Sequence, residues 1–362
     1  MSAQNPDSGD RAVLNNDRIT PIYRPEQKTK AAPCQAGCAN CGDVRGWIQT
    51  VAQRSKTGIS RRRAFQLAWQ TIAEVNPFPS TLGRICPHPC EARCNRSEKD
   101  EALAINAMER FLGDWAIDQE LPLVRLSDQR REEWLGVIGA GPSGLSFAYQ
   151  AARRGYRVTI YEKQAKAGGM LRFGVPDFRL PQDILDAEIE RILQLGVELR
   201  LNVELGRDIT LAQLHDRHTA LYLGIGAQSG RTLGVSGEKG ASVWTATEYL
   251  SILNRGGEVD LGQQVIVIGG GNSAVDAARC ARRTGAAVTL LYRRTRQEMP
   301  AASHEIDEAL NEGVQMSYLV APRSVVREPN GALRELSVCR VELGDPDESG
   351  RRRPTRVAGS DF

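Results

Sequence analysis

The feature that most constrains the fold of this 362-residue sequence is an internal repeat, in which one pattern returns 130 residues further along the chain. In each copy an apolar segment leads into a glycine-rich turn, a stretch with helical spacing and a second apolar segment. This order is typical of a strand–helix–strand unit. Because eight positions match in register over about twenty residues, we infer two copies of one structural unit. The matched pairs are Gly139 and Gly269, Gly141 and Gly271, Gly144 and Ala274, Ala151 and Ala281, Arg153 and Arg283, Gly155 and Gly285, Val158 and Val288, and Thr159 and Thr289.

The glycine turn of the first copy fits the pattern Gly-x-Gly-x-x-Gly, with Gly139, Gly141 and Gly144 at the fixed positions. In such a turn the first glycine permits a tight bend, the second lets a pyrophosphate approach the backbone, and the third lets the helix pack closely on the strand. Ser143 lies at the start of the expected helix, whose unpaired N–H groups attract phosphate. Glu162 ends the next expected strand, and an acid at that place accepts hydrogen bonds from the ribose of an adenosine. These parts together favour an FAD site over a tight turn in an unrelated α/β domain.

The turn of the second copy has a different partner at the end of its second strand. The predicted site residues of this turn are Gly269, Gly271, Asn272, Ser273 and Ala274. The position equivalent to Glu162 holds Tyr292, and Arg293 and Arg294 follow it. No carboxylate is present there to bind a 2′-hydroxyl, whereas two guanidinium groups could clamp a 2′-phosphate. This arrangement predicts NADPH rather than NADH, and a solvated arginine pair is the alternative interpretation.

A site for FAD and a site for NADPH in one chain predict hydride transfer between nicotinamide and flavin, which needs alignment more than acid–base groups. The chain has only 4 His, and we predict no catalytic acid or base. Its net charge of +3 is too balanced for a protein whose main partner is nucleic acid or an anionic membrane. Residues 1–30 contain no apolar signal segment, and glycines interrupt the apolar stretch 134–152. We therefore expect no membrane span and a cytoplasmic location.

Six of the eight cysteines form two closely spaced groups in the first hundred residues. Without export, disulfides are not expected, so these thiols should be reduced and available to a metal. An iron–sulfur cluster and a structural zinc site both suit such a set. The flavin favours the cluster, because a flavin takes up a hydride and can release electrons singly. Cys280 and Cys339 are isolated and are expected to be packing residues. The clustered residues are Cys34, Cys38, Cys41, Cys86, Cys90 and Cys94.

Several motifs together resemble one known family over essentially all of residues 34–362. They are similar to the glutamate synthase small subunit and to the N-terminal part of dihydropyrimidine dehydrogenase. The resemblance implies an electron-transfer subunit that uses NADPH, FAD and a [4Fe–4S] cluster and serves a larger catalytic partner. The motifs are Gly83-Arg84-Ile85-Cys86-Pro87-His88-Pro89-Cys90-Glu91, Cys94-Asn95-Arg96, Gly168-Gly169-Met170-Leu171, Phe173-Gly174-Val175-Pro176, Phe178-Arg179-Leu180-Pro181, Tyr292-Arg293-Arg294, Glu298-Met299-Pro300 and residues 269–276.

The resemblance also implies particular ligands. The implied ligands of one [4Fe–4S] cluster are Cys38, Cys86, Cys90 and, as a side-chain oxygen on the following helix, Glu109. A surface carboxylate is the alternative for Glu109. Cys34, Cys41 and Cys94 remain for a second cluster or as extra thiols, and relatives with two clusters carry a further cysteine pair where residues 1–33 have none. The implied FAD contacts beyond the first turn are Lys163, Gly169, Met170, Leu171 and Val175.

The expected fold class is α/β, with a small helical Fe–S domain followed by two Rossmann-type units, the NADPH unit being inserted into the FAD unit. Apolar residues recur with helical spacing at 44–51, 65–72 and 108–115, and Ser60 can cap the second of these helices. The expected segments are a flexible or docking arm at 1–33, the helical Fe–S domain at 34–126, the first part of the FAD-binding domain at 134–255 and an incomplete NADPH-binding domain at 256–362.

The predicted function is electron transfer between NADP(H), FAD and the cluster, to or from a glutamate synthase-type or 2-oxoacid:acceptor oxidoreductase-type partner. The sequence leaves the direction of electron flow open. The resemblance implies a further segment, beyond the position of Phe362, that closes over the flavin. Three alternatives follow: the sequence is a fragment, a neighbouring chain completes the FAD site, or the scaffold no longer holds flavin firmly. The alternative from another class is a non-catalytic assembly subunit that binds zinc and uses degenerate nucleotide folds as a scaffold.

Overall fold

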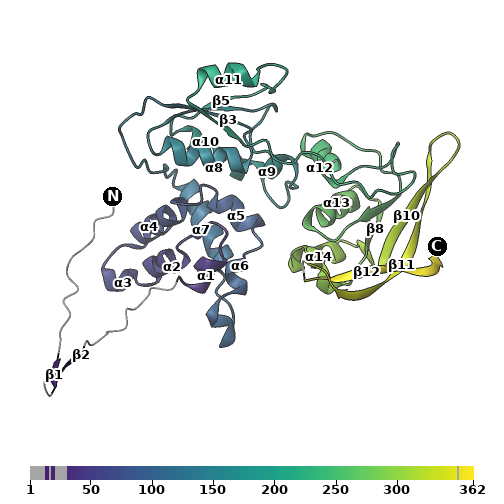
Figure 1. Cartoon of the computed structure of the whole chain (residues 1–362), viewed down its shortest axis with the longest axis horizontal. Coiled ribbons are helices and arrows are strands. Elements are labelled where there is room, and N and C mark those ends of the chain that lie inside the picture. Colours follow the sequence, from purple (N-terminus) through teal and green to yellow (C-terminus); the bar gives the residue numbers. More distant parts are fainter. Residues whose placement is uncertain (1–12, 16–17, 21–30, 349) are drawn as a thin grey trace.

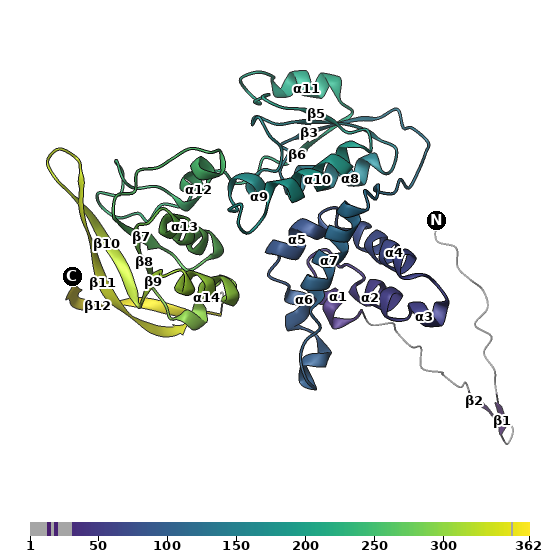
Figure 2. The same ribbon diagram turned by 180° about the vertical axis from the view of Figure 1, so that it is seen from behind.

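The computed structural model of the chain describes residues 13–15, 18–20, 31–348 and 350–362. A helical N-terminal part lies beneath a first α/β unit, and a second α/β unit lies beside both (Figure 1). The view from behind shows the same three parts in the same relation (Figure 2). The α/β fold class with a helical N-terminal part is therefore as the sequence predicts. Within the described ranges, no helix has the length and apolar character that a membrane crossing requires.

The predicted arm at 1–33 lies mostly outside the described residues. Two short strands of this segment are described, β1 (Val13–Asn15) and β2 (Arg18–Thr20), and they pair antiparallel. The helical part follows directly and contains all six clustered cysteines. Its helices are α1 (Pro33–Gly37), α2 (Val44–Ala52), α3 (Arg54–Thr57), α4 (Arg61–Ala73), α5 (Pro79–Ile85), α6 (Pro89–Ala92), the short 3-10 helix η1 (Asn95–Glu98) and α7 (Ile105–Asp118).

Local signals in the helical part account for its main elements. Helices α2, α4 and α7 coincide with the three predicted periodic stretches, and Ser60 caps α4 by accepting a hydrogen bond from the Arg63 N–H at 3.2 Å. Helices α5 and α7 cross in close contact because glycines lie at the crossing. A Cβ on Gly83 would lie 2.5 Å from the Cα of Arg110, and a Cβ on Gly113 would lie 2.4 Å from the amide nitrogen of Ser80. The two helices therefore form one tightly packed pair.

The first α/β unit is built on a parallel sheet with the strand order β5-β4-β3-β6. Leu135 pairs with Val158 on one side and with Ala220 on the other, so β3 is a central strand. Strand β6 forms one edge of this sheet among the described residues. The elements are β3 (Trp134–Ile138), α8 (Pro142–Ala152), β4 (Arg157–Tyr161), α9 (Met170–Phe173), α10 (Gln182–Leu193), β5 (Glu198–Arg200), α11 (Leu211–Arg217) and β6 (Ala220–Leu223).

The second α/β unit repeats the strand–helix–strand arrangement in a parallel sheet of order β7-β8-β9, and a long antiparallel sheet of order β10-β11-β12 follows it. The two central helices, α8 and α13, start at equivalent places after their glycine turns, as the repeat predicts. The elements are α12 (Ala246–Asn254), β7 (Gln264–Ile268), α13 (Asn272–Arg283), β8 (Ala287–Tyr292), the 3-10 helix η2 (Arg296–Glu298), α14 (Ser303–Asn311), β9 (Gln315–Tyr318), β10 (Val320–Arg327), β11 (Leu333–Pro346) and β12 (Arg352–Asp361).

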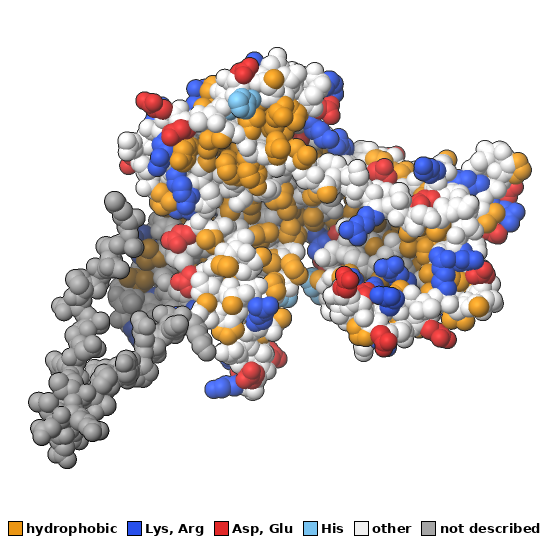
Figure 3. All heavy atoms as spheres, viewed as in Figure 1, with side chains coloured by type: hydrophobic (Ala, Val, Ile, Leu, Met, Phe, Trp, Pro, Cys, Tyr) orange, Lys and Arg blue, Asp and Glu red, His pale blue; other side chains and the backbone are white. Residues whose placement is uncertain are grey.

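The three parts are joined by buried contacts. One hydrophobic core contains Trp69 and Phe78 of the helical part together with Val137 and Leu145 of the first α/β unit. Because these side chains share a core, the helical part and the first unit pack as one body. The second unit has its own core around α13. In the space-filling view, hydrophobic side chains also gather on the visible face of the first unit (Figure 3).

Candidate functional site

The first glycine turn has a backbone that excludes larger residues at two positions. Gly139 has φ +102°, and a Cβ there would lie 2.4 Å from the carbonyl oxygen of Gly224. A Cβ on Gly144 would lie 1.9 Å from the carbonyl oxygen of Gly139, so the helix packs directly on the turn. At Gly141, in contrast, a Cβ would meet only the Cα of Gly169, at 3.8 Å. The turn therefore has open space where the pyrophosphate of a dinucleotide would approach, and it fits that group.

The carboxylate of Glu162 holds the first turn in place. Its two oxygens accept hydrogen bonds from the N–H of Ala140 at 2.7 Å and the N–H of Gln164 at 2.9 Å, and the residue is buried. Each carboxylate oxygen has a second lone pair, so both remain able to accept a further hydrogen bond. Glu162 thus lies at the turn where the sequence places it, and it also organises the backbone there. Its contact with ribose remains a prediction.

The predicted flavin-facing residues lie at different depths. The N–H of Gly168 donates to the carbonyl oxygen of Ala140 at 2.8 Å, which brings Gly169 and Met170 against the first turn. Lys163 is exposed on the same loop. The buried side chain of Leu171 belongs to the core, and Val175 packs against that core. The hydroxyl oxygen of Ser143 lies 2.7 Å from the hydroxyl oxygen of Tyr222 at the mouth of the turn.

The second glycine turn repeats the geometry of the first. Gly269 has φ +145°, and its Cβ position would lie 2.9 Å from the Cβ of Ala274. Gly271 precedes α13, and a Cβ there would meet only Pro300, at 4.0 Å, so this turn also has room for a phosphate. The side-chain oxygen of Asn272 accepts a hydrogen bond from the N–H of Ala302 at 3.0 Å. Ser273 is exposed at the start of α13.

The two arginines after β8 are separated by the fold. Arg293 is exposed, whereas Arg294 is 3% exposed. The Arg294 guanidinium donates to the backbone oxygen of Arg352 at 2.6 Å and pairs with the carboxylate of Asp347 at 2.6 Å. Asp347 lies in the turn between β11 and β12, and Arg352 is the first residue of β12. Contacts with the antiparallel sheet and its turn therefore hold the Arg294 side chain. Of the two arginines, only Arg293 is exposed and available to a 2′-phosphate.

Packing of α1 against α6 brings the two cysteine groups together. The Arg93 guanidinium donates to the carbonyl oxygen of Ala36 at 3.2 Å across this contact. Cys38 follows α1, Cys86 follows α5, and Cys90 is buried in α6. Burial raises the pKa of the Cys90 thiol to about 11, and the nearby charges of Glu91, Cys38 and Cys86 add to this increase. The thiols therefore lie within each other's electric fields, and a bound cation would favour their thiolate forms.

Glu109 lies near Cys86, on the neighbouring helix α7. Burial raises the pKa of Cys86, and the carboxylate of Glu109 and the thiol of Cys38 raise it further. One carboxylate oxygen of Glu109 accepts a hydrogen bond from the Asn76 side-chain nitrogen at 2.9 Å. Burial also raises the pKa of Glu109 itself. Glu109 is half-buried and lies close enough to Cys86 to act on its pKa, and its role as a fourth cluster ligand remains a prediction.

The remaining cysteines lie around this set. Cys34 packs on the helical core, and Cys41 is exposed with φ +52°. Cys94 is half-buried, and hydrogen bonds from the backbone N–H of Leu103 and Arg96 lower its pKa. Cys280 and Cys339 are buried and remote in sequence from the cluster, in agreement with a packing role. Over the described ranges, no group of three or more His, Cys, Asp or Glu side chains has an arrangement that could hold a metal ion.

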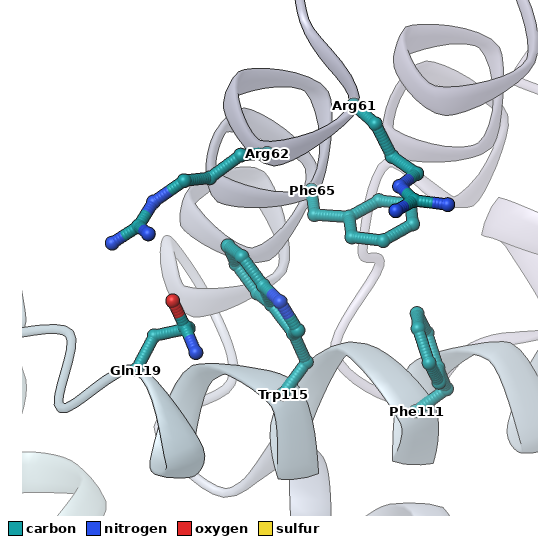
Figure 4. Close-up of a pocket in the computed structure, with 6 residues that line it drawn as sticks. All are labelled: Arg61, Arg62, Phe65, Phe111, Trp115 and Gln119. Carbon is teal, nitrogen blue, oxygen red and sulfur yellow. The ribbon is translucent and has the colours of Figure 1, made fainter.

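Figure 4 shows a shallow groove of about 450 Å³ between α4 and α7. Its floor is aromatic, with the rings of Phe65 and Phe111 edge to face at 5.3 Å. Phe111, which the periodicity places on the apolar face of α7, is 52% exposed here. No cysteine or acid lines the groove, so it is not part of the cluster site. The lining residues are Arg61, Arg62, Phe65, Phe111, Trp115 and Gln119.

Some polar residues have contact partners in another domain that the sequence motifs do not indicate. Arg179 of the first α/β unit reaches the second, where its guanidinium donates to both carboxylate oxygens of Asp276, at 2.9 and 2.7 Å. It also pairs with Glu305 at 2.7 Å. All three residues are buried. Glu188 makes a comparable contact with the helical part. Their roles depend on partners from other domains, which sequence spacing does not reveal.

Two family models match the chain. The model described as pyridine nucleotide-disulphide oxidoreductase matches residues 133–348, and the model described as dihydropyrimidine dehydrogenase domain II, 4Fe-4S cluster, matches residues 26–121. The fold and its two turns thus define a dinucleotide-dependent flavin oxidoreductase with an N-terminal 4Fe–4S domain. The chain belongs to the pyridine nucleotide-disulphide oxidoreductase family. These matches confirm the predicted fold class, the oxidoreductase class and the three cofactor types.

Individual relatives point to the same class. The chain is 39% identical over 357 residues to the beta subunit of the NADP(+)-dependent formate dehydrogenase of Moorella thermoacetica, covering 91% of this chain and 49% of that protein. It is 30% identical over 362 residues to the glutamate synthase [NADPH] small chain of Escherichia coli (strain K12), covering 94% of this chain and 76% of that one. This second match confirms the resemblance to the glutamate synthase small subunit.

The fold also resembles that of solved structures. A structure of FprA from Mycobacterium tuberculosis aligns with a TM-score of 0.56 at 18% identity, over 64% of this chain and 68% of that one. At this identity the likeness concerns the fold alone. The chain spans only 49% of the length of the formate dehydrogenase beta subunit, so the activity of a whole complex does not transfer directly.

Proposed function

We propose that this chain is an electron-transfer subunit that passes electrons between NADP(H), FAD and a [4Fe–4S] cluster, to or from a larger catalytic subunit. The observation that carries the proposal is the presence, in one chain, of two dinucleotide turns and a separate group of cysteines, most of them at least half-buried, in the helical part that packs on the first turn's domain. When bound, these groups supply hydride exchange between NADPH and flavin and single-electron exchange through the cluster. The domain boundaries stated for the sequence are part of this proposal.

The residues of the chain would divide this work as follows. The turn around Gly141, with Ser143 and Glu162, binds and orients FAD, while the turn around Gly271 binds NADPH. The exposed guanidinium of Arg293 contacts the 2′-phosphate and sets the preference for NADPH over NADH. The cluster ligands are Cys38, Cys86, Cys90 and Glu109.

The dinucleotide turns favour an iron–sulfur cluster over the zinc alternative. The cysteine set alone suits both, because thiolates bind zinc as well as iron. A flavin bound at the first turn takes up a hydride and can release electrons singly, and an iron–sulfur cluster can accept them. The match of residues 26–121 to a 4Fe-4S family model supports the same choice.

The partner remains the least determined part of the proposal. We infer a glutamate synthase-type partner or a 2-oxoacid:acceptor oxidoreductase-type partner, and the small chain of glutamate synthase among the relatives supports the first. We further propose that a neighbouring chain completes the FAD site at the edge strand β6. Leu223 and Ile225 are each 60% exposed at the end of this strand, beside the carbonyl of Gly224 that touches the first turn. A cytoplasmic location, with reduced thiols, is part of the same proposal.

Reconstitution tests the proposed function. The purified chain is loaded anaerobically with FAD, iron and sulfide, and its flavin, iron, sulfide and zinc contents are measured. We expect flavin bands and a broad iron–sulfur shoulder that bleach on addition of NADPH. Cys86→Ser should lose the shoulder, whereas Cys339→Ala, a buried cysteine outside the set, should keep it. A colourless preparation that contains zinc and does not respond to NADPH would contradict the proposal.

A further inference from the structure

A buried carboxylate links the first α/β unit to the helix that leads to a cluster ligand. Glu188 lies on α10 and is 0% exposed. One of its oxygens accepts a hydrogen bond from the N–H of Ser80 at 2.7 Å, and the other accepts one from the N–H of Thr81 at 2.9 Å. Both amides belong to α5, in the helical part of the chain. The contact therefore joins two domains through backbone atoms, whose positions do not depend on a flexible side chain on the α5 side.

Helix α5 transmits this contact to the cluster ligands. It ends at Ile85, and the N–H of the next residue, Cys86, donates to the carbonyl oxygen of Leu82 at 2.9 Å. From Thr81 to Cys86 the helical rise is about 7 Å. Leu82 and Ile85 pack on the core of the first α/β unit, and the glycine-mediated crossing with α7 ties α5 to the helix that carries Glu109. Any shift of α5 would therefore move both Cys86 and Glu109.

The other end of the link reaches the flavin-binding turn. Arg172 on α9 donates to the side-chain oxygen of Gln182 at 2.7 Å and pairs with Asp186, both on α10. Helix α9 begins at Met170, directly after the Gly169 that lies against the first turn. A continuous series of short contacts therefore runs from the glycine turn through α9, α10 and Glu188 to α5. Figures 1 and 2 show α9 and α10 at the boundary with the helical part.

A carboxylate is a costly way to hold two domains together. A fully buried acid loses its hydration, and well-packed apolar residues of similar volume often stabilise a fold as much or more. The apolar contacts of Leu82 and Ile85 already supply that kind of packing. Glu188 adds a restraint on position, because two hydrogen bonds to adjacent amides fix where α5 lies relative to α10. The positive charge of Arg191, one turn further along α10, acts on this carboxylate.

We propose that Glu188 is a positioning residue for electron transfer, and that its carboxylate holds Cys86 and Glu109 at a set distance from the flavin-binding turn. The inference rests on the proposed function and identifies the element that controls the step between the two cofactor sites. The rate of electron transfer between two sites depends on the distance between them, so a shift of α5 would change that rate without changing the groups that bind the cofactors. Glu188 itself neither binds a cofactor nor carries an electron.

Two substitutions and one control test the inference. Glu188→Gln keeps one acceptor oxygen but turns donors toward the second amide, and Glu188→Ala leaves both amides of α5 without a partner. Glu190→Gln on the same helix is the control, because Glu190 is exposed. The first measurement is amide hydrogen exchange at Ser80 and Thr81 in the full chain. We expect exchange to be about tenfold faster or more in both Glu188 variants and unchanged in the control.

The second measurement uses the loaded chain and rapid mixing with NADPH. Bleaching of the flavin bands reports hydride transfer, and bleaching of the iron–sulfur shoulder reports the later step. We expect Glu188→Gln to leave the first rate unchanged and to slow the second rate measurably relative to wild type and to Glu190→Gln. A purely structural role would instead lower cofactor content and both rates together, which would overturn the proposal.

The two readouts separate this inference from the proposed function. Unchanged hydrogen exchange at Ser80 and Thr81 in Glu188→Ala would refute the positioning role, whatever the cofactors do. Faster exchange combined with an unchanged second rate would also refute it. A wild-type chain that takes up no cluster would contradict the proposed function, while the exchange measurement would still show whether Glu188 holds α5.

Discussion

The two adjacent arginines after β8 allow a sharp test, because the fold gives them opposite surroundings. Arg293 is exposed beside the second glycine turn, whereas Arg294 is buried and paired with Asp347 and the backbone oxygen of Arg352. We predict that Arg293→Ala changes cofactor preference without changing stability. We predict that Arg294→Ala changes stability first. A sequence-level interpretation treats the two residues as one phosphate clamp and would expect similar effects.

The magnitudes follow from the contacts. Removing one partner of a buried ion pair typically costs about 3–5 kcal/mol. The side chain of Asp347 is 26% exposed, so water compensates part of this loss and we expect about 2–3 kcal/mol for Arg294→Ala. A charge-assisted contact to phosphate is worth about 1.5–3 kcal/mol. Loss of the Arg293 contact should therefore weaken NADPH binding by about tenfold to a hundredfold and leave NADH binding unchanged.

Equilibrium binding and unfolding measurements check both expectations on the same preparations. Titration with NADPH and NADH gives the preference ratio, and denaturant unfolding gives the free energy of unfolding. Arg231→Ala, an exposed arginine remote from this turn in the sequence, is a suitable charge control. The reasoning is refuted if Arg293→Ala keeps the wild-type preference. It is equally refuted if Arg294→Ala loses the preference with no loss of stability.

Three further predictions concern contacts between domains and between helices. Burial raises the pKa of Glu188 from 4.5 to about 7, so the native state binds this proton more tightly than the unfolded state does. The free energy of unfolding should therefore fall by about 3 kcal/mol as the pH rises from 4.5 to 7. Glu188→Gln should lose this pH dependence in urea unfolding, and an unchanged pH dependence would contradict the assignment. Gly113→Ala places a Cβ 2.4 Å from the Ser80 nitrogen. The substitution should destabilise the helical part by about 1–3 kcal/mol and lower its iron content. A melting temperature equal to that of the wild type would show that the two helices can separate without cost. Asp276→Asn weakens the ion pair with Arg179. It should lower the free energy of unfolding by about 1–3 kcal/mol and increase proteolysis between the two α/β units. Protease resistance equal to that of the wild type would show that this contact does not link the two units.

The local chemistry of the glycine turns could be predicted from the sequence. Gly139 and Gly269 both adopt positive φ, and each precedes a helix that begins where the repeat indicates. These features depend on residues close together in the chain, because backbone sterics and helix capping act over a few positions. The same is true of Ser60 at the start of α4. The identification of the family rests on such local motifs and agrees with the matched family models.

Contacts between distant segments could not be read in this way. Glu109 and Asn76 are ordinary polar residues in the sequence, and only the packing of α7 places this carboxylate beside Cys86 and under the Asn76 amide. Phe111 fits the apolar spacing of its helix, but the neighbouring helices leave it half exposed.

By itself, the sequence determined the two dinucleotide turns, the cysteine groups and the family, because each is encoded in short-range spacing. The tertiary structure decided which of the two arginines faces solvent, which acid lies near Cys86, and how Glu188 connects the flavin-binding unit to the helix that precedes Cys86. The physical reason is that burial and hydrogen-bond partners are properties of the packed chain. A side chain gains its charge state and its direction only when segments far apart in the sequence surround it.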